Sequence, residues 1–180
     1  MKKVYFDNAA TTQTDKDVAA TVLEYMTNTF GNPGSVHAFG REARKAVDIA
    51  REQVAKLIGA QPSEIFFTSG GTESDNISLK GVAYANRNRG KHIITSAIEH
   101  HAVLEPCEAL KKEGFDLTIL PVDEFGRVSV ETLKAAIRPD TILISIMFAN
   151  NEVGTMQPIA EIGAIARARG TYFHTDAVHA

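Results

Sequence analysis

Cysteine, long apolar runs, blocks of like charge and repeated or low-complexity segments are all scarce in this 180-residue sequence. The single cysteine, Cys107, cannot form an internal disulfide, so the composition fits a reducing compartment. No apolar run approaches the roughly 18 residues that a membrane-spanning helix needs. Only three apolar residues separate Lys3 from Asp7, too few for the hydrophobic region of a signal peptide. We therefore expect a cytoplasmic protein without a membrane span.

The charge balance gives no reason to expect nucleic acid or an anionic membrane as the main partner. Nineteen Lys and Arg residues stand against twenty-two Asp and Glu residues, for a formal net charge of −3. A small molecule or another protein is the expected partner. With 44% hydrophobic residues, the chain can bury a substantial core, and we expect one domain over residues 1–180.

Two helices are predicted in the first third of the chain. Thr14 and Asp17 are typical of a capping box, which predicts a helix that ends before Gly31, so residues 1–35 form an N-terminal arm and helix. An apolar stripe over 39–58 predicts a second helix, with Gly59 placed as its C-terminal glycine.

Strand-like and helical segments alternate along the chain. Short apolar runs rich in β-branched or aromatic residues predict buried strands over 64–68, 92–96, 116–121, 141–147 and 171–175. Helices are predicted near 73–89, 101–113, 129–138 and 158–169. This alternation predicts the α/β class, with a mainly parallel sheet and helices on both of its faces.

Ligands of open α/β sheets bind beyond the carboxyl ends of the strands, and polar residues follow four of the predicted strands. In "TSGGTESDN", two glycines allow a tight turn into a helix that starts near Thr72, whose free backbone N–H groups would bind a phosphate. Ser69 and Thr72 could add hydroxyl donors. The alternative is an ordinary glycine turn with Thr72 or Ser74 as the N-cap. The segment matches neither the Walker pattern nor the dinucleotide fingerprint.

Histidines and asparagines follow two further strands. His100 in "IEHHAV" could stack on a flat ligand or transfer protons near neutral pH, whereas His101 is expected to be solvated. In "FANNEVG", Asn150 and Asn151 could orient a ligand oxygen, or their amides could simply stabilise a turn.

Asp176 follows the last predicted strand, between His174 and His179. A buried carboxylate must be hydrogen-bonded or paired with a cation, because an unpaired buried charge is costly. A metal site formed by these three residues is an alternative, since imidazole and carboxylate are common zinc and iron ligands.

Taken together, "YFDNAATT", "FGNPGSVHAFG", "FTSGGTESDN", "EHHAV", "FANNEVGT" and "HTDAVHA" occur in the order and spacing of one family. The sequence resembles the N-terminal part of a cysteine desulfurase of the NifS/IscS type, a class V aminotransferase of fold type I. The resemblance implies the large domain that binds pyridoxal 5'-phosphate. In that family the enzyme converts L-cysteine to L-alanine and delivers the sulfur, through a cysteine persulfide, to iron–sulfur cluster assembly.

The resemblance also implies roles for individual residues. Gly71 and Thr72 would bind the cofactor phosphate, His100 would stack on the pyridine ring and assist proton transfer as the catalytic residue, and Asn151 would contact the phenolic oxygen. Asp176 would pair with the protonated pyridine nitrogen, which keeps the ring electron-accepting.

The sequence departs from the family at three points. His179 stands where the family usually has a glutamine that contacts the phenolic oxygen. The Ser-x-His-Lys stretch with the Schiff-base lysine and the loop with the persulfide cysteine are both absent from the 180 residues. Cys107 lies on a predicted helix and is expected to serve helix packing.

These departures leave several alternatives open. The chain is expected to be an N-terminal portion that is inactive alone, or one half of a split enzyme that a C-terminal half chain completes. A non-catalytic module for dimerisation or partner binding is the alternative from a different class. The partners implied by the resemblance are L-cysteine, a second copy of the chain, and an iron–sulfur scaffold or other sulfur-accepting protein.

Overall fold

The computed structural model describes residues 3–178 and divides the chain into two compact units, 1–67 and 68–180. The first unit contains α1 (Lys16–Thr27), α2 (Ala38–Ile58) and a short 3₁₀ helix, η1 (Pro62–Glu64). The second unit contains the remaining helices and all of the strands in the described residues. The single domain expected from the sequence stays a prediction.

The helix boundaries in the first unit agree with the sequence except at one cap. The predicted capping box at Thr14 is wrong, because Asp15 is the N-cap of α1 and its carboxylate accepts the backbone N–H of Asp17 at 2.8 Å. A carboxylate at this place also interacts favourably with the positive end of the helix dipole. Gly59 ends α2 in the left-handed conformation, with φ at 69°, which confirms the predicted C-terminal glycine.

The strand predicted over 64–68 is also wrong. Residues 65–67 follow η1 as an extended segment that pairs with no strand of the described chain. Ile65 is buried, but Phe66 and Phe67 are exposed by 81% and 51%. The guanidinium of Arg51 lies 5.1 Å from the centre of the Phe67 ring. Within the described residues, this apolar segment therefore forms no strand, and only Ile65 of its large apolar side chains is buried.

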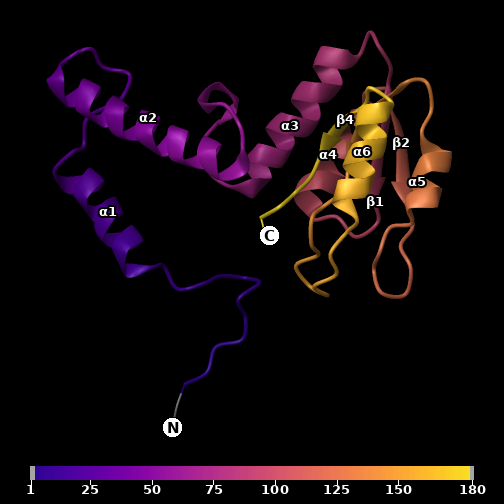
Figure 1. Cartoon of the computed structure of the whole chain (residues 1–180), viewed down its shortest axis with the longest axis horizontal. Helices are drawn as coiled ribbons and strands as arrows, with labels where there is room; N and C mark the ends of the chain where they lie inside the picture. The colour runs from indigo at the N-terminus through magenta and orange to yellow at the C-terminus, as the bar shows by residue number, and fades with distance from the viewer. Residues whose placement is uncertain (1–2, 179–180) are drawn as a thin grey trace. The chain divides into compact units, whose positions relative to one another are not determined.

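The second unit is built on four parallel strands: β1 (His92–Ser96), β2 (Asp116–Leu120), β3 (Thr141–Ser145) and β4 (Tyr172–His174). Their order in the sheet is β2-β1-β3-β4. The helices are α3 (Gly71–Asn86), α4 (His101–Lys112), α5 (Val130–Ala136) and α6 (Ile159–Ala168). In Figure 1, α5 and α6 cover one face of the sheet, and α3 and α4 lie on the other. The predicted fold class is confirmed.

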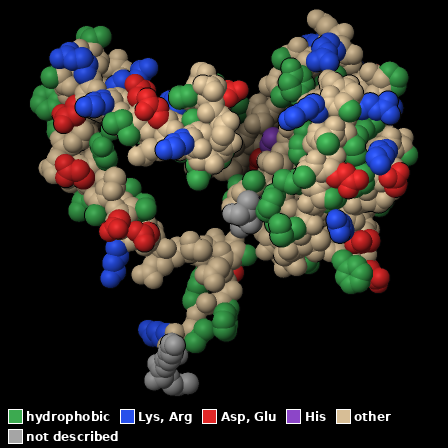
Figure 2. All heavy atoms as spheres, viewed as in Figure 1, with side chains coloured by type: hydrophobic (Ala, Val, Ile, Leu, Met, Phe, Trp, Pro, Cys, Tyr) green, Lys and Arg blue, Asp and Glu red, His purple; other side chains and the backbone are tan. Residues whose placement is uncertain are grey.

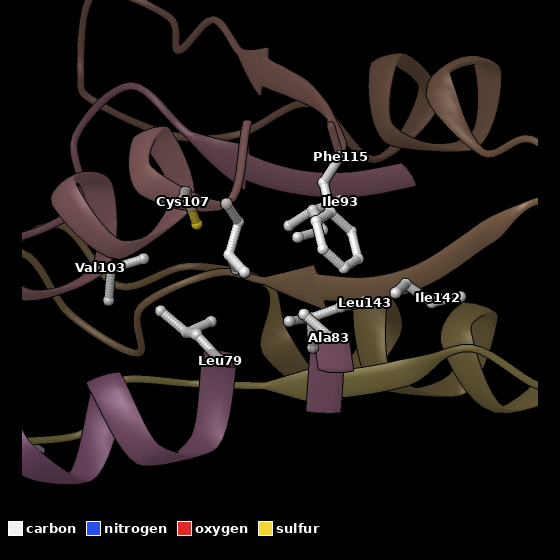
Figure 3. Packing of buried hydrophobic residues seen from close by; sticks show 9 residues of the cluster. Leu79, Ala83, Ile93, Val103, Cys107, Phe115, Ile142 and Leu143 are labelled. Carbon is white, nitrogen blue, oxygen red and sulfur yellow. The ribbon is translucent and has the colours of Figure 1, made fainter. Parts of the chain in front are cut away.

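The two faces of the sheet bury separate apolar cores because successive strand residues point to opposite sides. Ile93 and Leu143 pack with residues of α3 and α4, among them Leu79 and Cys107 (Figure 3). The neighbouring Ile94 and Ile144 pack on the opposite face with residues of α5 and α6, namely Leu133, Ile162 and Ala166.

Polar side chains at the amino edge of the sheet satisfy one another. The buried His92 contacts Thr141 and Thr118 through its two ring nitrogens at 2.7 Å and 2.8 Å. Arg138 pairs with Asp116 and Asp140 at 2.7 Å and 2.6 Å. This edge therefore needs no ligand to complete its hydrogen bonding.

Basic and acidic side chains are interspersed on the face of the molecule that Figure 2 shows. Among residues 3–178, no helix combines the length and the apolar character that crossing a lipid bilayer requires.

The structure predicts that Leu79 and Ile77, both on α3, contribute very differently to the free energy of unfolding. Leu79→Ala is expected to lower the free energy of unfolding by about 3 kcal/mol, because Leu79 is fully buried between the sheet and α4. Ile77→Ala is the control, since Ile77 is 58% exposed, and a change within about 0.5 kcal/mol is expected. Urea unfolding monitored by circular dichroism measures both. Equal losses would contradict the assigned packing of α3.

Candidate functional site

The strand order places a topological switch point between β1 and β3. The chain leaves β1 through α4 on one face of the sheet and leaves β3 towards α6 on the other face. The loops that follow these two neighbouring strands therefore diverge and leave a crevice at the carboxyl edge, where ligands of open α/β sheets bind.

A cavity of about 130 Å³ lies at this edge. Its lining residues are Gly71, Thr72, Asp75, His100, Ala102, Asn151, Asp176 and Val178. The structure thus brings together five of the six residues predicted as cofactor-binding from the sequence. The sixth, His179, lies outside the described residues.

The first turn of α3 offers backbone donors to the cavity. Gly70 is the N-cap and makes no side-chain cap, so the alternative of a Thr72 or Ser74 cap is wrong. The Ser74 hydroxyl instead contacts Thr68 Oγ1 at 2.6 Å. Gly71 also permits a close approach, because a Cβ there would lie 2.6 Å from Cγ2 of Val178. The result is an uncapped helix N-terminus of the kind that binds anions.

The hydroxyl of Ser69 as a phosphate donor stays a prediction, but the backbone N–H of this residue is already used. Its backbone N–H donates to the carboxylate of Glu73 at 2.6 Å, and this hydrogen bond lowers the pKa of Glu73. The N–H groups of Gly71 and Thr72, which line the cavity, are the better placed donors.

His100 is the N-cap of α4, and a backbone N–H of the same helix hydrogen-bonds to its ring. Its Nδ1 accepts the N–H of Ala102 at 3.1 Å, so Nε2 carries the proton in the neutral ring. This hydrogen bond orients the imidazole. The ring of His101, which is exposed as predicted, lies edge-on to it with the ring centres 6.2 Å apart.

The two asparagines differ in their contacts: Asn150 stabilises a turn, and Asn151 lines the cavity. Asn150 donates to the carbonyl of Ile98 at 2.9 Å, and its Oδ1 accepts the N–H of Val153 at 2.9 Å, so it stabilises the turn and ties it to the loop after β1. Asn151 lines the cavity, and its amide has no hydrogen-bond partner among residues 3–178.

Asp176 lies two residues after β4, with 9% of its surface exposed. Its Oδ1 accepts the N–H of Val178 at 3.0 Å, and its backbone carbonyl accepts the N–H of Phe148 at 2.7 Å. The latter bond continues the pairing of β3 with β4 beyond the strands. The start of α3 and Asp176, which we call the two ends of the site, therefore line one cavity.

The metal alternative also needs His179, which lies outside the described residues, so that triad stays untested. Within residues 3–178 no three His, Cys, Asp or Glu side chains are grouped so that they could hold a metal ion. His174 instead contacts Ser145 Oγ through Nδ1 at 2.8 Å and lies 3.4 Å from Asp75 Oδ1 through Nε2.

Cys107 is a packing residue, as the sequence predicted. It is fully buried on α4 within the core between α3, α4 and the sheet, and burial raises the pKa of its thiol to about 12. A thiol of this kind is neither exposed nor ionised at neutral pH.

Sequence reasoning missed two buried acids next to the cavity, Asp75 and Glu99. Asp75 occupies the buried stripe of α3 that continues with Leu79 and Ala83, and an acid in an apolar stripe is a usable signal. Glu99 directly precedes His100. Its Oε1 accepts the Ser96 hydroxyl at 2.5 Å and the backbone N–H of Met147 at 2.9 Å, which joins the loops after β1 and β3.

Unsatisfied polar atoms concentrate at this edge of the sheet. Among residues 3–178, the buried side-chain oxygens without a hydrogen-bond partner belong to Asp75, Thr95, Glu99 and Thr175. Asp75 lies in α3, Thr95 lies near the end of β1, Glu99 follows β1, and Thr175 follows β4. Buried groups of this kind call for an explanation, and a ligand site provides one.

Comparison with known proteins identifies the family. The chain matches the family model described as aminotransferase class-V over residues 4–180, and it belongs to that family. It is 59% identical over 179 residues to the cysteine desulfurase IscS of Methanosarcina thermophila, a match that covers 99% of this chain and 44% of the relative. The chain thus spans about half the length of the curated relatives it matches.

Solved structures give the same result for the fold. A NifS-like protein superposes with a TM-score of 0.95 at 46% identity, covering 99% of this chain and 50% of that one. A structure titled SspA in complex with cysteine superposes with a TM-score of 0.92 at 43% identity, covering 96% and 50% of the two chains.

Class V aminotransferases and cysteine desulfurases depend on pyridoxal 5'-phosphate. The cavity fits the chemistry of that group. It offers an uncapped helix N-terminus for a phosphate, a carboxylate for a pyridinium nitrogen, an imidazole and an unpartnered amide.

The raised pKa of Glu99 makes stability depend on pH. Burial raises the pKa of Glu99 from its ordinary 4.5 to about 7. Between these values the folded chain binds more protons than the unfolded one, so stability falls as the pH rises from about 4.5 to 7. Relative to Glu99→Gln, the wild type is expected to lose on the order of 3 kcal/mol between pH 5 and pH 8.

Urea unfolding at the two pH values measures this difference. The exposed Glu105, on the same loop-to-helix segment, supplies the control variant Glu105→Gln, which should follow the wild type at both pH values. If Glu99→Gln also follows the wild type, the carboxyl of Glu99 does not titrate in this range.

Proposed function

We propose that this chain is the N-terminal part of a pyridoxal 5'-phosphate-dependent cysteine desulfurase, which converts L-cysteine to L-alanine and transfers the sulfur through a persulfide. The observation that carries the proposal is one cavity at the switch point of the sheet, whose wall contains both donors for an anion and a carboxylate for a cation. Its identity to curated cysteine desulfurases supports the substrate assignment.

The N–H groups at the start of α3, with the Thr72 hydroxyl, bind the cofactor phosphate in this proposal. They do so without a competing side-chain cap. Asp176 holds the proton on the pyridine nitrogen, because a buried carboxylate favours the cationic form of a neighbouring base. When bound, the cofactor supplies an electron-accepting ring for bond cleavage at the substrate Cα.

His100 and Asn151 line the same cavity as these two ends of the site. The Nδ1 contact with the backbone fixes the plane of the His100 ring, so that the ring can stack on the cofactor while Nε2 holds or moves a proton. The free amide of Asn151 donates to the phenolic oxygen. His179, at the place of the usual glutamine, is the further contact proposed for that oxygen.

The partners in this proposal are L-cysteine, a second copy of the chain, and an iron–sulfur scaffold or other sulfur-accepting protein in the cytoplasm. A lysine that binds the cofactor covalently and a reactive cysteine must come from sequence beyond these 180 residues or from a C-terminal half chain. The only cysteine present is the buried Cys107. The chain alone is therefore expected to bind the cofactor without a covalent bond and without turnover.

Binding of pyridoxamine 5'-phosphate tests the site directly, because this probe keeps the phosphate, the ring nitrogen and the phenolic oxygen but has no aldehyde to react with lysines. Asp176→Asn retains an oxygen that can accept the Val178 N–H and loses the charge, so we expect at least a tenfold weaker affinity by equilibrium dialysis. Asp140→Asn, at the opposite edge of the sheet, is the matched control and should bind as the wild type does. Equal affinities for all three proteins would contradict the proposed role of Asp176.

A chimera tests the activity. Residues 1–180 replace the matching part of the Methanosarcina thermophila desulfurase, and alanine formation from L-cysteine is measured. The chimera is expected to be active and its Asp176→Asn variant to be strongly impaired. A well-folded chimera that binds the cofactor but forms no alanine would favour the non-catalytic alternative.

A further inference from the structure

Asp75 and His174 make a buried contact between the two elements that carry the two ends of the site. Asp75 belongs to α3, His174 belongs to β4, and Asp75 Oδ1 lies 3.4 Å from His174 Nε2. The exposed fractions of the two side chains are only 6% and 16%. Solvent therefore screens this contact little.

Asp75 is close to the anion-binding end. It lies one helical turn after Gly71 on α3, so the two residues share a face of the helix. Asp75 lines the cavity itself, and its Oδ2 is buried without a hydrogen-bond partner in residues 3–178. A shift of this helix turn relative to β4 would move the backbone donors of the cavity with it.

His174 is close to the carboxylate end. It precedes Asp176 by two residues, and its backbone carbonyl accepts the N–H of Ile146 at 3.1 Å. Its ring is anchored on β3, because Nδ1 lies 2.8 Å from Ser145 Oγ. A neutral ring with its proton on Nε2 satisfies both contacts: Ser145 donates to Nδ1, and Nε2–H points towards Asp75.

We propose that Asp75 and His174 are positioning residues that fix the separation of the two ends of the cofactor site. This inference rests on the proposed function. A ligand that touches both ends gains affinity from the second contact only if the two ends are held at the right distance. The contact between α3 and β4 supplies that distance, whereas neither residue needs to touch the ligand.

A purely electrostatic role for Asp75 makes the opposite prediction. A negative charge on the cavity wall repels a phosphate, so removal of the charge alone would strengthen phosphate binding. Asp75→Asn removes the charge and keeps an oxygen that can accept from His174, while Asp75→Ala removes both. The two variants therefore separate positioning from repulsion.

The experiment compares three probes on the intact chain by NMR titration: inorganic phosphate for the helix end, pyridoxine for the ring end, and pyridoxamine 5'-phosphate for both. Asp75→Ala and His174→Ala are expected to bind pyridoxamine 5'-phosphate about tenfold more weakly than the wild type. Their affinities for phosphate alone and for pyridoxine alone should stay within about twofold. Asp75→Asn should restore most of the lost affinity for pyridoxamine 5'-phosphate.

Ser78→Ala is the control on α3, because the Ser78 side chain is half-buried and outside the cavity lining. Far-UV circular dichroism checks the fold of each variant, and retained phosphate binding shows that the start of α3 is intact. If both alanine variants bind pyridoxamine 5'-phosphate as tightly as the wild type does, the positioning role is overturned. The proposed function is not affected by that result. Stronger phosphate binding by Asp75→Asn, without rescue, favours repulsion and also overturns the positioning role.

The wild-type chain separates this inference from the proposed function. If it binds pyridoxamine 5'-phosphate no more tightly than inorganic phosphate, the two ends do not act on one ligand. The proposed cofactor site then fails, and the positioning role fails with it.

Discussion

Parallel pairing of four strands is the constraint on which the second unit depends. Because all four strands run the same way, their carboxyl ends lie at one edge, and the residues that follow them converge there although they are far apart in the sequence. The divergence of the chain after β1 and β3 opens the crevice at that edge. His100, Asn151 and Asp176 reach one cavity for this reason, and the start of α3 completes it.

The two edges of the same sheet differ in how their polar groups are satisfied. At the amino edge, His92 and Arg138 find partners within the chain, and the contacts add to stability. At the carboxyl edge, buried oxygens of Asp75 and Glu99 have no partner in the described residues, and the first turn of α3 has no side-chain cap. A protein that only needed to fold would gain from closing these hydrogen bonds, so the contrast separates a structural edge from a functional one.

The sequence was most informative where a single physical signal decides the outcome. The run over 92–96 is buried on both faces and forms β1 with those bounds, and Gly59 ends α2 because its left-handed conformation favours glycine. The run over 64–68 misled because apolar composition alone guarantees neither burial, since Phe66 and Phe67 are exposed, nor the neighbouring strand that pairing needs. Asp75 was missed although an acid in the apolar stripe of α3 was a signal, whereas its contact with His174, almost a hundred positions away, exists only in the folded chain.

Asp176 is carried by a strand of only three residues at the end of the strand order. Short edge strands are among the first parts of a sheet to open, so the carboxylate belongs to a locally weak region although the core beneath it is well packed. An opened β4 cannot bind, and the apparent affinity of the site therefore scales with the fraction of molecules in which this strand is docked. Anything that pairs with the side of β4 that has no neighbouring strand in residues 3–178 would raise that fraction, and would tighten cofactor binding without touching the cofactor.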